Sequence, residues 1–261
     1  MNKPRVAIHK LSSCDGCQLA FLNAGAALLE LAQLVDLVHF AEAGAVQPDA
    51  AVDIAFVEGS ITTAHEIERI QNIRANSKYL VTIGACATSG GIQALRNGKM
   101  QGADWISSVY ASPQFISSLD TSSAIARHVK VDYELWGCPV TSRQVLQLLR
   151  DLLFAVRPKI SADPVCLDCK RAGNVCVLVA RGEPCMGPVT RTGCGALCPA
   201  FGRACYACFG PSEHVNGRAL GQRLSGLGLT ADAVKKQFLF INSGAEAYAA
   251  AAAAGTEVKH D

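Results

Sequence analysis

The chain has 261 residues, half of them hydrophobic, which is enough to bury a substantial core in one large domain or two modest ones. Its formal charge is only +2 and no dense run of Lys or Arg occurs, which excludes the electrostatic pattern of a nucleic-acid-binding protein. No apolar run reaches the roughly 20 residues of a membrane-spanning helix and no signal-peptide core precedes the first cysteines, so we expect no transmembrane segment and a cytoplasmic location.

The first 160 residues alternate short strands with helical stretches. Strands rich in β-branched or aromatic residues are expected over 5–11, 35–40, 52–59, 78–85 and 129–137. Apolar residues recur at i, i+3 and i+4 over 17–34, 64–77 and 142–156, which predicts helices there. Strands that alternate with helices indicate a parallel sheet covered on both faces, so we expect an α/β fold with a flavodoxin-like domain over residues 1–160.

The composition changes near Pro158, where the stretch RPKISADPVC carries two prolines and indicates a linker. Beyond it, the segment from Cys166 to Cys208 holds eight of the twelve cysteines among Gly and Pro, with little regular periodicity. Such a segment cannot build a conventional core, so residues 161–261 are expected to form a small irregular domain that folds around metal. A helix is expected near TADAVKKQFLFI, and the alanine-rich tail is expected to be a packing helix or a frayed terminus.

The twelve cysteines are the outstanding feature of the composition. The chain is larger than typical disulfide scaffolds and no export signal is apparent, so a disulfide framework is not expected. In a reducing compartment, many cysteines at short spacings indicate metal, and twelve is the number of ligands that three four-thiolate centres need.

Four of these cysteines follow predicted strands of the sheet. Cys14 and Cys17 lie just beyond the first strand, Cys86 beyond the fourth and Cys138 beyond the fifth. Open α/β sheets bind their ligands at this edge, and the glycines next to these cysteines leave room for a bulky group. The pattern favours an iron–sulfur cubane. A thioredoxin-type redox pair in CDGC and a four-cysteine zinc site are the alternatives.

The other eight cysteines fall into two groups of four by their order in the chain. One group is Cys166, Cys169, Cys176 and Cys185, and the other is Cys194, Cys198, Cys205 and Cys208. So many thiols in so short a segment would repel one another as thiolates or oxidise if they were free, which indicates bound iron or zinc. A zinc ribbon is the alternative to iron–sulfur clusters here.

Glu58 ends the third predicted strand, at the same sheet edge as the first four cysteines. One interpretation is a functional carboxylate beside the metal group or on a proton path. The other is a buried acid whose hydrogen bonds are satisfied within the fold.

Taken together, these motifs resemble the small, electron-transferring subunit of [NiFe] hydrogenases. The resemblance extends to about Pro211 through SSCDGCQ, VEGSI, GACATSGGIQA, GCP and GEPCMGPVTRTGCGALCP, in this order. It implies a flavodoxin-like domain with a proximal cluster on Cys14, Cys17, Cys86 and Cys138. It implies a distal cluster on Cys166, Cys169, Cys176 and Cys185, and a medial cluster on Cys194, Cys198, Cys205 and Cys208. All three are expected to be [4Fe–4S] clusters that relay electrons.

The resemblance also implies partners. With its twelve cysteines assigned, the chain offers no site for nickel, so the catalytic nickel–iron centre is expected in a separate large subunit. No twin-arginine signal is present, and Cys166 stands where periplasmic relatives supply a histidine ligand. The chain is therefore most similar to the cytoplasmic multi-subunit group that includes the sulfhydrogenases. In that group, electrons are exchanged with flavin or iron–sulfur subunits that react with NAD(P) or another acceptor.

Two rival functions remain open at this point. The cluster-bearing subunit of a quinone-reducing, complex I-like assembly has a similar sheet domain, but it carries adjacent cysteines at its first ligand position and generally lacks the second Cys-rich domain. A zinc-stabilised interaction module would explain the segment from Cys166 to Cys208 but would leave the four cysteines at the sheet edge unexplained.

Overall fold

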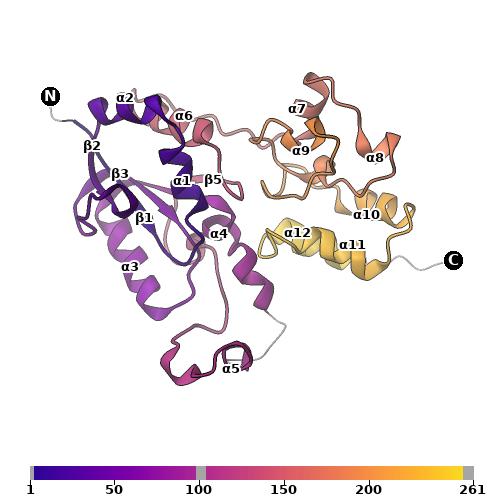
Figure 1. Cartoon of the computed structure of the whole chain (residues 1–261), viewed down its shortest axis with the longest axis horizontal. Coiled ribbons are helices and arrows are strands. Elements are labelled where there is room, and N and C mark those ends of the chain that lie inside the picture. Colours follow the sequence, from indigo (N-terminus) through magenta and orange to yellow (C-terminus); the bar gives the residue numbers. More distant parts are fainter. Residues whose placement is uncertain (1–2, 98–103, 255–261) are drawn as a thin grey trace.

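A five-stranded parallel sheet forms the first part of the chain in the computed structural model, which describes residues 3–97 and 104–254 (Figure 1). Its order is β2-β1-β3-β4-β5, and each neighbouring pair is parallel. The strands are β1 (Arg5–Lys10), β2 (Asp36–Phe40), β3 (Val52–Glu58), β4 (Ser77–Ile83) and β5 (Tyr133–Leu135). The sheet confirms the expected α/β fold, although β5 is much shorter than the strand expected over 129–137.

Both faces of the sheet are covered, because successive side chains of a strand point to opposite faces. Val6 and Ile8 of β1 belong to one core, which also contains residues of α1 (Gly16–Leu22) and α6 (Ser142–Leu153). Ala7 belongs to the other core, together with residues of α3 (Ala64–Ala75). Both α3 and α6 begin with a capping box, which fixes where these helices start.

The single helix expected over 17–34 is wrong. The chain forms α1 and then α2 (Ala26–Leu34), and the two helices are bent by 83° relative to each other. Gly25 precedes α2 with a φ of 59°, a conformation that interrupts a helix and that suits glycine. Among the described residues, no single helix has the length and apolarity to cross a membrane, and only this bent pair meets both criteria when counted together.

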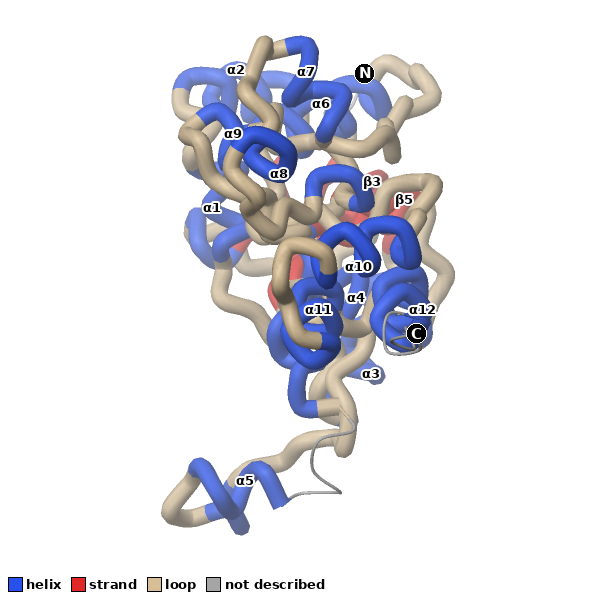
Figure 2. Tube along the Cα trace, turned by 90° about the vertical axis from the view of Figure 1, so that its right-hand side faces the viewer, coloured by secondary structure: helices blue, strands red, loops and turns tan. Residues whose placement is uncertain are grey.

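The connection from β4 to β5 is long and leaves the body of the sheet. It contains α4 (Gly84–Ser89), η2 (Ile92–Arg96), α5 (Asp104–Val109), η3 (Pro113–Phe115) and η4 (Ile125–Arg127). The stretch around α5 projects beyond the rest of the molecule in both views (Figures 1 and 2). A shorter excursion, η1 (Ala41–Ala43), follows β2.

The Cys-rich segment folds from short helices and loops. It contains α7 (Cys166–Arg171), α8 (Val177–Ala180), η5 (Gly187–Val189) and α9 (Leu197–Ala200). Three further helices follow, α10 (Gly217–Ser225), α11 (Ala231–Phe238) and α12 (Glu246–Ala254). These elements share one core, in which Tyr248 of α12 is fully buried against Phe238 of α11. The alanine-rich tail is therefore a packing helix as far as Ala254.

A stacked histidine pair lies under α3. His9 of β1 and His39 of β2 are both buried, with ring centroids 4.6 Å apart. Burial lowers the pKa of His9 from 6.5 to about 3, and the pKa of His39 is lowered for the same first reason. Both rings are therefore neutral in the folded protein at neutral pH.

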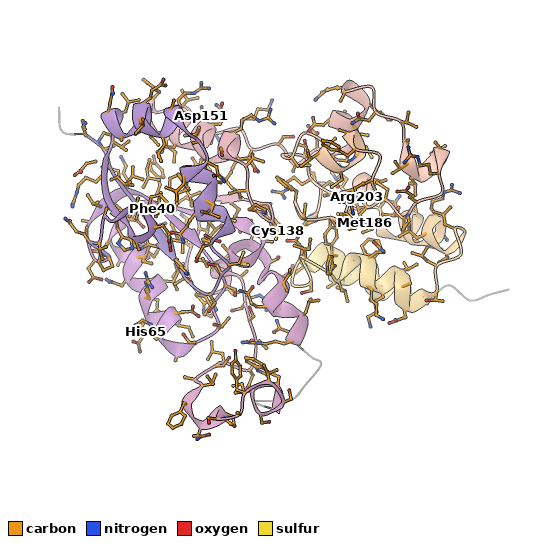
Figure 3. The ribbon with its side chains drawn as sticks, in the orientation of Figure 1. Phe40, His65, Cys138, Asp151, Met186 and Arg203 are labelled. Atoms are coloured by element: carbon orange, nitrogen blue, oxygen red, sulfur yellow. The ribbon has the colours of Figure 1, made fainter. Side chains whose placement is uncertain are left out.

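This pair predicts that acid destabilises the fold. The unfolded chain takes up protons at these rings below a pH of about 6.5, whereas the folded chain does not. Stability should be full above that pH and should fall as the pH drops toward 3, by up to about 1.4 kcal/mol per pH unit for His9. Anaerobic denaturant titrations at pH 7 and 5.5 should show that the free energy of unfolding changes less with pH in the His9→Leu variant than in the wild-type protein. The variant of the exposed His65 (Figure 3), His65→Leu, should keep the wild-type dependence, and equal dependence in all three proteins would contradict the assignment.

Candidate metal centres

The four cysteines at the sheet edge come together as expected. Cys14 lies in the loop after β1, Cys17 in α1, Cys86 in α4 and Cys138 just after β5. Burial, and after it the nearby thiols of Cys138 and Cys14, raises the pKa of Cys86 to about 12. The pKa of Cys17 is raised by burial, by Glu58 and by Cys86 and Cys138. Each of these thiols therefore has others of the set as electrostatic neighbours, and we call the four the first quartet.

Glycines keep space open at two of these sulfurs. Gly84 has a φ of +89°, and a Cβ there would lie 2.4 Å from the Cys17 Sγ. Gly91 has a φ of +60°, and its Cβ would lie 2.7 Å from the Cys86 Sγ. No side chain fits at either position without displacing a sulfur. Gly137, next to Cys138, is needed for a different reason, because a Cβ there would lie 2.7 Å from the backbone carbonyl oxygen of Pro139.

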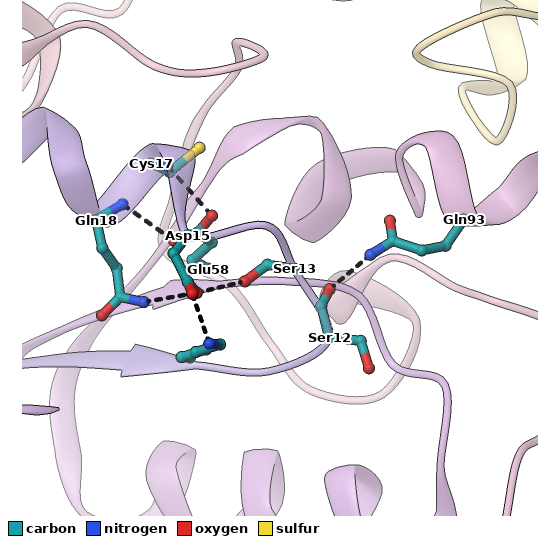
Figure 4. A network of polar contacts seen from close by, with 8 residues as sticks. Ser12, Ser13, Asp15, Cys17, Gln18, Glu58 and Gln93 are labelled. Atoms are coloured by element: carbon teal, nitrogen blue, oxygen red, sulfur yellow. Dashed lines mark hydrogen bonds and ion pairs between the residues drawn. The ribbon is translucent and has the colours of Figure 1, made fainter. Parts of the chain in front are cut away.

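Glu58 serves the first quartet by holding the start of α1 (Figure 4). Its Oε1 accepts a hydrogen bond from the backbone N–H of Cys17 at 3.2 Å, and its Oε2 accepts one from Gln18 N–H at 3.0 Å. The N-cap residue of α1, Asp15, makes no side-chain capping bond to the helix backbone. Glu58 therefore satisfies free N–H groups at the N-terminus of α1 from a distant strand. Burial raises the pKa of this carboxyl, while the two backbone hydrogen bonds oppose that shift.

This geometry predicts the effect of Glu58→Gln. The amide would face one of the two N–H groups with its own NH₂, so stability to denaturant should fall by about 2 kcal/mol. If the chain has the hydrogenase role that its motifs predict, the H2-uptake rate of the assembled complex, per bound iron, should stay unchanged, because the role of Glu58 is to position Cys17. The exposed Glu68→Gln variant on α3 is the control for loss of one charge. Unchanged stability with lost uptake would instead assign Glu58 to a proton path.

Gln93 also belongs to this site, and sequence reasoning missed it. Its side-chain Oε1 lies 3.2 Å from the Cys86 Sγ, where the thiol can donate to it, and its Nε2 donates to the Ser12 carbonyl at 2.9 Å (Figure 4). The residue lies within the motif GGIQA, but nothing in that motif indicates that its side chain turns back to the cysteines.

The second quartet consists of Cys166, Cys169, Cys176 and Cys185, and all four line one small cavity. The pKa of Cys166 is raised to about 11. Burial is the largest cause, and the thiols of Cys185, Cys169 and Cys176 come next. A Cβ on Gly187 would lie 3.3 Å from the Cys166 Sγ and 3.4 Å from the Cys185 Sγ, so a glycine again leaves room beside the sulfurs.

The third quartet consists of Cys194, Cys198, Cys205 and Cys208. Burial, and after it the thiols of Cys205, Cys194 and Cys198, raises the pKa of Cys208 to about 12. Thiols of the other quartets also act on this one: Cys138 raises the pKa of Cys208, and Cys185 raises that of Cys205. The Cys205 N–H also lies 3.3 Å from the Cys185 Sγ, so the third quartet neighbours both the second and the first, although it comes last in the chain. Cys138 itself lies at the junction of the two parts (Figure 3).

The donor sets fit iron–sulfur clusters better than single zinc ions. All twelve cysteines are free thiols. Zn²⁺ binds sulfur at about 2.3 Å, so four zinc-bound sulfurs lie only about 3.8 Å from one another. Over residues 3–97 and 104–254, no three His, Cys, Asp or Glu side chains converge closely enough to hold one metal ion. In a cubane each cysteine binds a different iron, so its four sulfurs lie further apart than four sulfurs on one zinc ion.

Comparison with known proteins identifies the family. The family described as NADH ubiquinone oxidoreductase, 20 Kd subunit, matches residues 14–152. The chain belongs to this family. Among the relatives, the sulfhydrogenase 2 subunit delta of Pyrococcus furiosus is 33% identical over 209 residues, covering 80% of this chain and 86% of the relative. The 209 aligned residues are more than the 160 residues of the sheet part, so the similarity extends into the Cys-rich part.

Other relatives and a solved structure give the same picture. The NAD-reducing hydrogenase HoxS subunit delta of Cupriavidus necator is 30% identical, covering 58% of this chain and 79% of the relative. The structure of an NAD+-reducing [NiFe]-hydrogenase in the H2-reduced state shares 28% identity with a TM-score of 0.55, covering 61% of this chain and 96% of that one. A relative from Archaeoglobus profundus is named an F420-non-reducing hydrogenase iron-sulfur subunit. The resemblance to hydrogenase small subunits is confirmed, and iron–sulfur clusters are supported.

Proposed function

We propose that this chain is the small subunit of a [NiFe] hydrogenase, an oxidoreductase acting on H2, and that it holds three [4Fe–4S] clusters. The observation that supports this best is the spatial order of the quartets, first, third and second, which runs from the sheet edge into the Cys-rich part. The proximal ligands are Cys14, Cys17, Cys86 and Cys138. The medial ligands are Cys194, Cys198, Cys205 and Cys208, and the distal ligands are Cys166, Cys169, Cys176 and Cys185.

When bound, the clusters supply one-electron transfer between the nickel–iron site and an acceptor. The residues of this chain hold, space and shield them. Cys17, Cys185 and Cys205 are buried, so each quartet has one ligand shielded from water, whereas Cys14 and Cys176 are exposed. The Cys205 N–H lies 3.3 Å from the Cys185 Sγ and donates to it across two quartets. Such hydrogen bonds to sulfur stabilise the more negative, reduced state and so adjust each potential.

The proposal includes partners and location. A large subunit carries the nickel–iron centre, because every cysteine of this chain is already a cluster ligand in the proposal. A flavin or iron–sulfur subunit passes electrons to NAD(P) or another acceptor, as the names of the NAD-reducing relatives suggest. The complex is cytoplasmic, and this chain contributes a proximal-cluster domain over 1–160 and a medial- and distal-cluster domain over 161–261.

Metal analysis of the anaerobically purified complex tests this proposal. Iron, acid-labile sulfide and zinc are measured per copy of this chain after subtraction of the other subunits' content, with EPR after dithionite reduction. About twelve iron and twelve sulfide, with interacting S = 1/2 signals, would support three [4Fe–4S] clusters. Stoichiometric zinc without iron would overturn the electron-transfer role and favour the zinc-stabilised interaction module.

A further inference from the structure

Residues 104–119 form an arm that stands away from both parts of the molecule (Figures 1 and 2). The arm contains α5 and η3 and belongs to the long connection between β4 and β5. None of the iron–sulfur ligands lies on it, so the proposed electron path gives it no role.

Beyond Asp104 the arm is uncharged and carries several large apolar side chains. From Trp105 to Leu119 no residue is charged, and three are aromatic. Yet Phe115 is 81% exposed, Val109 68% and Tyr110 45%. Exposed loops of soluble domains are normally polar, whereas the centres of protein interfaces are depleted of charge and rich in aromatic residues. An exposed apolar group of this kind marks a contact surface.

The base of the arm is fixed to the sheet part. The guanidinium of Arg96 lies 4.5 Å from the centre of the Trp105 ring. It also donates to the Ser118 hydroxyl at 3.1 Å and to the Leu119 carbonyl at 3.2 Å. Leu119 N–H in turn donates to the Thr62 carbonyl at 2.7 Å. The exposed tip is thus presented on an anchored base, so less ordering is needed when a partner binds.

Hydrogen bonds connect this base to the first quartet. Thr62 bonds Ser12 through their hydroxyls at 2.6 Å, and the Ser12 carbonyl accepts from Gln93, which contacts Cys86. The Cys-rich part approaches α4 elsewhere, where Asn242 accepts from the Ser89 hydroxyl at 2.9 Å. The side of the first quartet that carries the arm is therefore distinct from the side that the rest of this chain covers.

We propose that the arm inserts its tip, Val109, Tyr110, Phe115 and Ile116, into an uncharged apolar groove of the large subunit. This inference rests on the proposed function, because electron transfer falls steeply with distance and requires that subunit to lie against the first quartet. Leu19 on α1 and Ile92 on η2, the elements that carry Cys17 and Gln93, are also exposed apolar residues. The arm then fixes the large subunit beside the proximal ligands without touching them.

Co-purification of the hydrogenase complex tests the arm. Tagged Phe115→Asp and Val109→Asp variants are co-expressed with the other subunits and purified anaerobically, and the bound large subunit is quantified together with the iron on this chain. We expect at least about tenfold less large subunit with unchanged iron on this chain. Phe154→Asp is the matched control, because Phe154 is 67% exposed and follows α6, far from the arm in Figure 1. Full retention of the large subunit, or an equal loss in the control, would overturn the inference.

A photo-reactive phenylalanine analogue at position 115 gives a second readout in a complex that keeps its apolar tip. Cross-links to the large subunit would support the inference. Cross-links to a second copy of this chain, to the acceptor subunit or only within this chain would overturn it. Failure of the proposed function is distinguishable, because it would appear as missing iron in the wild-type complex, before any change to the arm.

Discussion

Alanine in place of Gly84 should prevent the first quartet from holding its cluster. The added Cβ would lie 2.4 Å from the Cys17 Sγ, which is closer than any non-bonded contact allows, and the φ of +89° disfavours any side chain. The sulfur must therefore move, and a cluster tolerates little displacement of its ligands. We expect iron on this chain to fall from about twelve to about eight atoms, with loss of H2-dependent reduction of the acceptor.

The control for this prediction is Gly44→Ala. Gly44 has a φ of +83°, nearly that of Gly84, but a Cβ there meets nothing within 4 Å. Gly44→Ala should cost the same backbone strain, roughly 1–2 kcal/mol, and keep all its iron. Iron analysis and EPR of both purified variants compare the two effects. Equal iron in the two variants would show that the space beside Cys17 is not needed for a cluster.

Removal of iron should unfold the Cys-rich segment and leave the sheet folded. The helices of this segment, α7, α8 and α9, have only six, four and four residues, too few to be stable alone. Buried Cys185 and Cys205 are part of the core that α10, α11 and α12 share. Without metal, four-thiolate sites lose the bonds that hold these loops together. The sheet, in contrast, has two apolar cores that include few thiols.

Hydrogen exchange after anaerobic chelation measures this difference. Backbone amides over 166–208 should exchange at least about a hundredfold faster than in the iron-loaded protein, while those of β1, β3 and β4 should keep most of their protection. Uniform loss of protection would show that the two parts unfold together. Unchanged protection over 166–208 would contradict the idea that metal holds this segment.

Local patterns predicted the sheet part well because their causes are local. Runs rich in β-branched and aromatic residues located all five strands, and helical spacing located α3 and α6 to within a few residues. The interrupted helix shows the limit of this approach. Apolar spacing continues through 17–34, but at Gly25 the chain bends, so that α2 lies at 83° to α1 before β2 begins. The connection between β4 and β5, with its arm, had no periodic pattern to predict it.

The sequence by itself determined the donors: twelve cysteines, four of them at the ends of strands in one parallel sheet, with the rest in a segment too irregular to fold by apolar packing alone. Only the tertiary structure decided how these donors relate to one another in space. It placed the third quartet next to both of the others, used Glu58 to hold a helix 41 residues away, and left an apolar arm exposed. The reason is physical, because donor chemistry and strand periodicity belong to neighbouring residues, whereas these contacts join residues that only packing brings together.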